Sequence, residues 1–158
     1  MLLGKKRKLG RKVEDMAAGE KLKLTEKIED KDLLLYLGLT NDGNPLYIQH
    51  DFASQTSFEK PVVPTIMLTG IITSAVSKYL PGPGSYINEQ RLKFLKPVYH
   101  YSTIDFLLEV IEVDIKNNEV TVRVEATDEK GQKVVEGVII SNPPQLQNRL
   151  TTQAMDNF

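Results

Sequence analysis

The feature that most constrains the fold of this chain is an almost uninterrupted apolar segment, TIMLTGIITSAVSKYL, at Thr65–Leu80. Pro64 precedes it, at a position where a helix readily tolerates proline, and the PGPG run that begins at Pro81 would stop a helix sharply. Apolar and small residues cover nearly every face, which predicts a helix buried in a core. The segment is too short, and too interrupted by Thr, Ser and Lys, for a transmembrane helix.

Hydrophobic residues recur with a period of two before and after this helix. Leu22 and Leu24 alternate with lysines in EKLKLTEKI, which predicts a half-buried strand. Four further strands are expected near Ser85–Leu95, Thr103–Ile115, Glu119–Thr127 and Lys133–Ser141. A buried helix followed by a meander of long strands predicts an α+β fold, in which an antiparallel sheet wraps around the helix.

Two shorter segments lie between the first strand and the long helix. EDKDLLLYLGLTNDG has acidic residues at its start and an apolar group, Leu33–Leu39, that covers more than one face, which predicts a short helix. Asn41–Pro45 is rich in Asn, Asp, Gly and Pro, so we expect a turn there.

Composition limits the classes of protein that need to be considered. A chain of 158 residues, 41% hydrophobic and 26% charged, is typical of one globular domain. Cysteine is absent, which excludes disulfides, thiolate metal sites and a cysteine nucleophile, and no metal or cofactor motif is found. The net charge of −1 gives no global attraction to nucleic acid or membranes. We expect a cytoplasmic protein with one domain at 13–144, between tails at 1–12 and 145–158.

The start of the chain is locally basic. Its cationic residues are Lys5, Lys6, Arg7, Lys8, Arg11 and Lys12. Such a cluster is compatible with phosphate or nucleic-acid contacts, or with a solvated terminus. No aromatic residue interleaves the charges and no DNA-binding helix pair follows, so we expect a solvated tail.

The segment Asp42–Tyr47, DGNPLY, carries a carboxylate, a turn-forming Asn-Pro pair and an aromatic ring five residues after the acid. With its surroundings it resembles the signature of the MaoC-like, single hot-dog acyl-thioester hydratases, which include the (R)-specific enoyl-CoA hydratases. The matching residues are Asp42, Asn44, Pro45, Phe52, Ala53, Phe58, Pro61, Val62, Val63, Phe94, Pro97 and Val98. The match runs without a gap from Asp42 to Gly70, and the resemblance extends from about Val13 to about Pro143.

The resemblance implies a hot-dog fold, with the sheet wrapped around the Thr65–Leu80 helix. It also implies a ligand, an acyl-CoA or acyl-carrier-protein thioester, and an assembly, a homodimer or a dimer of dimers. In the family, an Asp and a His hold the water that is added across the double bond of an enoyl thioester. A backbone N–H at the start of the central helix holds the thioester carbonyl.

This chain departs from the family pattern where the chemistry is done. Tyr47 stands at the position of the catalytic His, Pro64–Thr65 replaces the His-Gly pair before the helix, and Tyr101–Ser102 replaces a Gly-Asp pair. Of the catalytic pair, Asp42 alone remains. The candidate residues implied by the resemblance are Asp42 and Tyr47 for catalysis, and Asn44, Pro64, Thr65 and Ile66 for substrate binding.

These replacements change the expected chemistry. A histidine, with a pKa of about 6.5, suits a general base, whereas a tyrosine, at about 10, is protonated at neutral pH and acts as a hydrogen-bond donor. Asp42 would serve as a base if burial raised its pKa, or would cap the turn through its side chain. Thr65 keeps its backbone N–H, but its β-branched side chain leaves less room for the thioester carbonyl to approach the start of the helix.

The two histidines do not restore the missing base. We expect His50 to be exposed on a loop, and His100 to be structural or solvent-facing. Three functions remain open: a hydratase or dehydratase with Asp42 as base and Tyr47 as donor, a non-catalytic protein that binds acyl thioesters, and a thioesterase with a lone carboxylate.

Overall fold

The computed structural model describes residues 9–145. Its elements are a 3-10 turn at Val13–Asp15, β1 at Lys21–Lys27, α1 at Asp30–Thr40, α2 at Pro45–Ile48, α3 at His50–Ser54, α4 at Thr65–Tyr79, β2 at Tyr86–Phe94, β3 at Thr103–Asp114, β4 at Glu119–Thr127 and β5 at Lys133–Asn142. All five predicted strands and both predicted helices are present, with ends that differ from the predicted ones by at most three residues.

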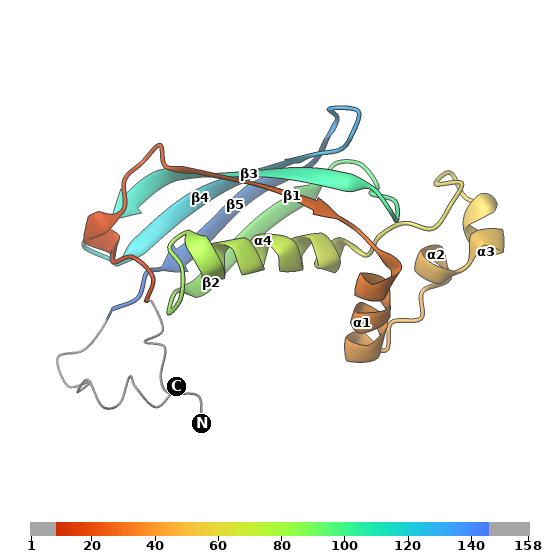
Figure 1. The fold of residues 1–158 in the computed structure, drawn as a ribbon, viewed down its shortest axis with the longest axis horizontal. Coiled ribbons are helices and arrows are strands. Elements are labelled where there is room, and N and C mark those ends of the chain that lie inside the picture. Colours follow the sequence, from red (N-terminus) through yellow and green to blue (C-terminus); the bar gives the residue numbers. More distant parts are fainter. Residues whose placement is uncertain (1–8, 146–158) are drawn as a thin grey trace, which may run out of the picture.

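The strands form one antiparallel sheet in the order β1-β3-β4-β5-β2. The sheet curves over α4, and the short helices α1, α2 and α3 gather at the end of the molecule where α4 begins (Figure 1). This arrangement confirms the predicted α+β hot-dog fold. None of the helices within residues 9–145 is long and apolar enough to cross a membrane.

The core lies between α4 and the concave face of the sheet. The helix contributes Leu68, Ile72, Ala75 and Val76, and the central strands contribute Ile104, Phe106, Leu108, Val110, Val120, Val122, Val124 and Ala126, all with exposures of at most 3%. Burial of each large apolar side chain stabilises the fold by about 1.5–3 kcal/mol, so this layer holds the sheet against the helix.

The expectation that α4 is buried nearly all round is wrong for the single chain. Ile66 is 53% exposed and Tyr79 is 60% exposed, because the sheet covers only one side of the helix. The sequence shows that every face is apolar enough to be buried, but not which faces have a neighbour.

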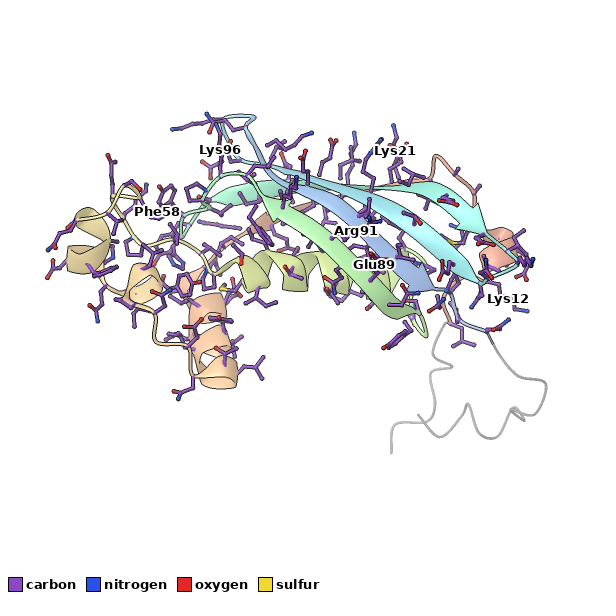
Figure 2. The ribbon with its side chains drawn as sticks, turned by 180° about the vertical axis from the view of Figure 1, so that it is seen from behind. Lys12, Lys21, Phe58, Glu89, Arg91 and Lys96 are labelled. Atoms are coloured by element: carbon purple, nitrogen blue, oxygen red, sulfur yellow. The ribbon has the colours of Figure 1, made fainter. Side chains whose placement is uncertain are left out.

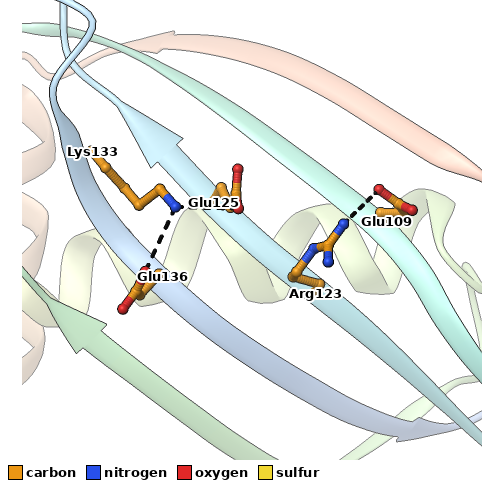
Figure 3. Close-up of polar contacts among 5 residues, drawn as sticks. All are labelled: Glu109, Arg123, Glu125, Lys133 and Glu136. Atoms are coloured by element: carbon orange, nitrogen blue, oxygen red, sulfur yellow. Dashed lines mark hydrogen bonds and ion pairs between the residues drawn. The ribbon is translucent and has the colours of Figure 1, made fainter.

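The convex face of the sheet carries charge instead of apolar side chains. Arg123 on β4 lies opposite Glu109 on β3, with 3.0 Å between Nη2 and Oε2. Lys133 Nζ lies 3.3 Å from Glu125 and 3.6 Å from Glu136, on β4 and β5 (Figure 3). Exposed pairs of this kind contribute about 0–1 kcal/mol each, so their main effect is to keep this face hydrated.

Two loops differ from expectation. Asn41 ends α1 in the left-handed conformation, at φ 54°, and starts the predicted turn. Pro45 does not belong to that turn but opens α2, whose N-cap Asn44 accepts a hydrogen bond from the Leu46 N–H at 3.0 Å. Helices α2 and α3, of four and five residues, were not predicted, because segments this short show no helical period.

Part of the basic start of the chain is attached to the domain. Gly10 and Arg11 donate backbone hydrogen bonds to the carbonyls of Pro83 and Pro81, and the Arg11 guanidinium pairs with Glu20. Arg11 is therefore engaged in the fold, contrary to the expected solvated tail. The other basic residues of that cluster, except Lys12, lie outside the described residues, as does the tail beyond Gln145.

A test of the sheet register follows from Gly137 on β5. A Cβ at this position would lie 1.9 Å from the carbonyl oxygen of Arg91 and 2.9 Å from the Cα of Leu92, so β2 would have to move away from β5. We expect Gly137→Ala to lower the free energy of unfolding by about 1–3 kcal/mol or more, measured by urea denaturation. The matched control is Gly38→Ala in α1, where an added Cβ meets nothing within 4 Å. Because alanine favours a helix more than glycine does, this variant should raise the free energy of unfolding by up to about 1 kcal/mol. Equal stability of Gly137→Ala and the wild type would contradict this register.

Candidate functional site

A cavity of about 340 Å³ opens at the first turn of α4. Its lining includes Tyr47 from α2, Phe58 from the loop after α3, Thr65 and Leu68 from α4, and Phe94 at the end of β2. Three segments distant in sequence therefore meet where the central helix begins. Figure 2 shows Phe58 at this end of the molecule.

Backbone hydrogen bonds fix the walls of this cavity. The Val62 N–H donates to the Leu46 carbonyl at 3.1 Å, and the Val63 N–H donates to the Val98 carbonyl at 2.7 Å. Val62 also forms a β-bridge with Tyr99. These bonds join the Tyr47 segment and the β2–β3 connection to the strand-like residues before α4, so the lining is held by the fold.

The start of α4 presents unpaired donors. Met67 donates to the Pro64 carbonyl at 3.0 Å, whereas the Thr65 and Ile66 N–H groups have no hydrogen-bond partner within residues 9–145. First-turn N–H groups carry the positive end of the helix dipole, and both residues are exposed. A carbonyl oxygen, and still more an oxyanion, is the ligand that suits them.

Asp42 is bonded to its own neighbourhood. The Tyr36 hydroxyl donates to Oδ2 at 2.5 Å, and the Asn44 N–H donates to Oδ1 at 3.2 Å. The bond to Asn44 is the turn-capping interaction that the sequence offered as one alternative. Asp42 is not among the residues that line the cavity at α4.

Tyr36 is a member of the site that sequence reasoning missed. Its hydrogen bond to the Asp42 carboxylate, with a smaller effect of burial, raises the pKa of Tyr36. The Tyr36 ring also meets the Tyr47 ring edge-on, at 6.5 Å between centroids and 76° between planes. Tyr36 therefore contacts both candidate catalytic residues: its hydroxyl bonds to Asp42 and its ring packs against Tyr47.

The remaining predicted residues take different positions. His50 is exposed, as expected, but it is the first residue of α3 and does not belong to a loop. Asn44 caps α2, and Pro64 is the buried cap residue of α4, one residue before the helix. No three His, Cys, Asp or Glu side chains gather to form a metal site in the described part of the chain.

Tyr101, which the sequence predicted to stand at a glycine position of the resembled motif, has a positive φ. Its φ of 67° lies in the left-handed region that glycine adopts without strain. The Tyr101 hydroxyl donates to Asp30, and this bond raises the pKa of Tyr101. Ser102, at the position of the family's Asp, accepts the Ile28 N–H through its backbone carbonyl at 2.9 Å.

Comparison with known proteins identifies the relatives of this chain. Residues 13–130 match the family described as the MaoC like domain. An (R)-specific enoyl-CoA hydratase from Rhodospirillum rubrum is 32% identical over 124 residues, which covers 78% of this chain and 85% of that protein. A 3-hydroxybutyryl-CoA dehydratase from Methylorubrum extorquens is 29% identical over 100 residues, with coverages of 63% and 64%.

Solved structures give the same result. The R-hydratase PhaJ1 from Pseudomonas aeruginosa, unliganded, superposes with a TM-score of 0.79 at 26% identity, covering 87% of this chain and 88% of that one. The (R)-hydratase from A. caviae superposes with a TM-score of 0.78 at 25% identity, covering 82% and 98%.

Proposed function

Because the chain belongs to the MaoC-like dehydratase family, we propose that it binds an acyl-CoA or acyl-carrier-protein thioester and adds or removes water at an enoyl thioester only slowly. One observation carries this proposal. The cavity at the start of α4 contains Tyr47 and Thr65, and its lining does not include Asp42.

The binding half of the proposal rests on the start of α4. The thioester carbonyl accepts hydrogen bonds from the Thr65 and Ile66 N–H groups, which have no partner among the described residues. Val63, Leu68 and Phe94 supply an apolar surface for the acyl group beside those donors. The Thr65 side chain lies on the same cavity, so it limits how closely the carbonyl approaches.

The catalytic half is weak for two reasons. A phenol hydroxyl such as that of Tyr47 donates a hydrogen bond, but it is a poor acceptor for a proton from water. Asp42 would have to give up the hydrogen bond from Tyr36, and to reach the cavity, before it could act as the base. A well-placed general base raises the rate of such a reaction about 10²–10⁴-fold, and we propose that this chain lacks that contribution.

A second candidate function, thioester binding without turnover, is favoured by the same bonds around Asp42. Both carboxylate oxygens already accept hydrogen bonds from the chain itself, as expected of a structural residue. Thioester hydrolysis by a lone carboxylate is disfavoured, since Asp42 does not line the cavity. A cytoplasmic location stays a prediction from the sequence.

We also propose that the protein acts as a homodimer, alone or within a dimer of dimers. Strand β2 is an edge of the sheet, and an unpaired edge can pair with a second copy. Ile66 and Tyr79 on α4 and Leu34 and Leu35 on α1 are at least 53% exposed, and a partner would cover them. Light scattering should give twice the 17.8 kDa chain mass, or four times that mass. A stable monomer at micromolar concentration would refute the proposal.

The catalytic half is tested by an assay of crotonyl-CoA hydration. The loss of the enoyl-thioester absorbance measures the hydration rate, and thiol release is measured in parallel. We expect the wild type to turn over well below the usual range of about 1–10³ s⁻¹. Tyr47→His supplies a base of suitable pKa, so it should raise the rate by up to about 10²-fold, and more when combined with Thr65→Gly.

Tyr47→Phe is the control, because it keeps the ring and removes the hydroxyl. It should change the slow rate less than Tyr47→His does. A wild type that works at ordinary enzyme rates and is abolished by Tyr47→Phe would show that tyrosine is a true catalytic replacement. Thiol release faster than hydration would identify a thioesterase instead.

A further inference from the structure

A second cavity, of about 520 Å³, lies beside the first. It is formed by the β2–β3 connection and the turn between β4 and β5, and Lys96, Pro97 and Val98 line both cavities. Figure 2 shows Lys96 at the same end of the molecule as Phe58, which lines the first cavity. A ligand bound at α4 therefore has a neighbouring space within reach. We call this space the lysine cavity.

The lysine cavity is lined by three cationic side chains. Lys60, Lys96 and Lys130 come from separate segments, and none of them forms an ion pair within residues 9–145. Like charges that line one cavity repel each other, so an anion bound between them would be stabilised by all three.

The two carboxylates of the same lining are already engaged. Asp128 accepts the N–H groups of Lys130 and Gln132, each at 2.9 Å, and closes the β4–β5 turn. Glu129 accepts the Thr103 N–H at 2.6 Å. Each carboxylate thus accepts hydrogen bonds from the backbone, whereas the three ammonium groups have no carboxylate partner within residues 9–145.

His100 adds a polar group to this lining. Both of its ring nitrogens are buried, and neither has a hydrogen-bond partner in the described part of the chain. A neutral imidazole always presents one N–H donor and one acceptor, and a buried donor left unpaired costs about 1–3 kcal/mol. A turn of the His100 ring would expose that N–H to the lysine cavity, where an anionic oxygen would accept it.

The wall of the lysine cavity is held in place. The Tyr99 hydroxyl donates to the Phe58 carbonyl at 2.9 Å, and Lys60 Nζ lies 4.5 Å from the centre of the Tyr99 ring. The Tyr101 N–H donates to the Ile28 carbonyl at 2.7 Å. The segment that carries His100 is therefore fixed on both sides.

We propose that the lysine cavity binds the phosphate end of the thioester carrier while the thioester lies at α4. This inference rests on the proposed function. The shared chemistry is a phosphate ester on a pantetheine arm, present in CoA and in the prosthetic group of acyl carrier proteins. Lysine ammonium groups bind phosphate as point charges, and the His100 N–H provides a directed bond.

Calorimetric titration of the full chain with CoA, pantetheine 4′-phosphate and pantetheine tests this without any turnover. In the Lys96→Gln/Lys130→Gln double variant, CoA should bind at least about tenfold more weakly than in the wild type, and pantetheine should bind equally to both. Lys93→Gln is the matched control, because Lys93 is also exposed but does not line this cavity.

The probes distinguish the source of the phosphate. If pantetheine 4′-phosphate loses affinity in the double variant as CoA does, one phosphate suffices and a carrier protein fits. If only CoA loses affinity in the double variant, the lysine cavity binds the phosphates of the CoA nucleotide. CoA that binds the double variant as tightly as the wild type would overturn the inference and leave the proposed function standing. A wild type that binds neither CoA nor pantetheine would overturn both.

Discussion

The packing of α4 against the concave face of the sheet is the constraint on which the rest of the structure depends. Leu68, Ile72 and Val76 are at most 2% exposed, and they fix both the depth and the direction of the helix. Because Val63 and Val98 are bonded together just before the first turn, the helix start is fixed as well. The Thr65 N–H is thereby placed on a cavity that the neighbouring loops complete, and the Ile66 N–H follows it in the same first turn.

The position of one carboxylate decides what that cavity can do. Tyr36 lies in α1, and its hydroxyl holds the Asp42 side chain at the end of that helix. Tyr47 lines the cavity where the family has a histidine, and it provides a donor instead of a base. In the function that we propose, the start of α4 binds the thioester carbonyl, while neither Tyr47 nor Asp42 activates water efficiently. Ligand binding and turnover are separable properties in such a molecule.

Much of the fold could be predicted from the sequence. Prolines bracket Thr65–Tyr79, and alternation marks β3 and β4, so the predicted ends of these elements were correct within one residue. The one-sided burial of α4 could not be predicted, since apolar residues alone do not say where a neighbour lies. The bond between Tyr36 and Asp42 was also missed, because it depends on the left-handed turn at Asn41, which brings the carboxylate back to α1.

The central claim is that the thioester carbonyl binds at the start of α4 independently of Asp42. Infrared difference spectroscopy of crotonyl-CoA with ¹³C at the thioester carbonyl tests it most directly, because a hydrogen bond lowers the carbonyl stretching frequency. We expect a lower frequency on binding to the wild type, the same shift in Asp42→Asn, and a smaller shift in Thr65→Pro, which removes one N–H at a helix position that tolerates proline. An unshifted band in the bound complex, or a shift that disappears in Asp42→Asn, would contradict the account.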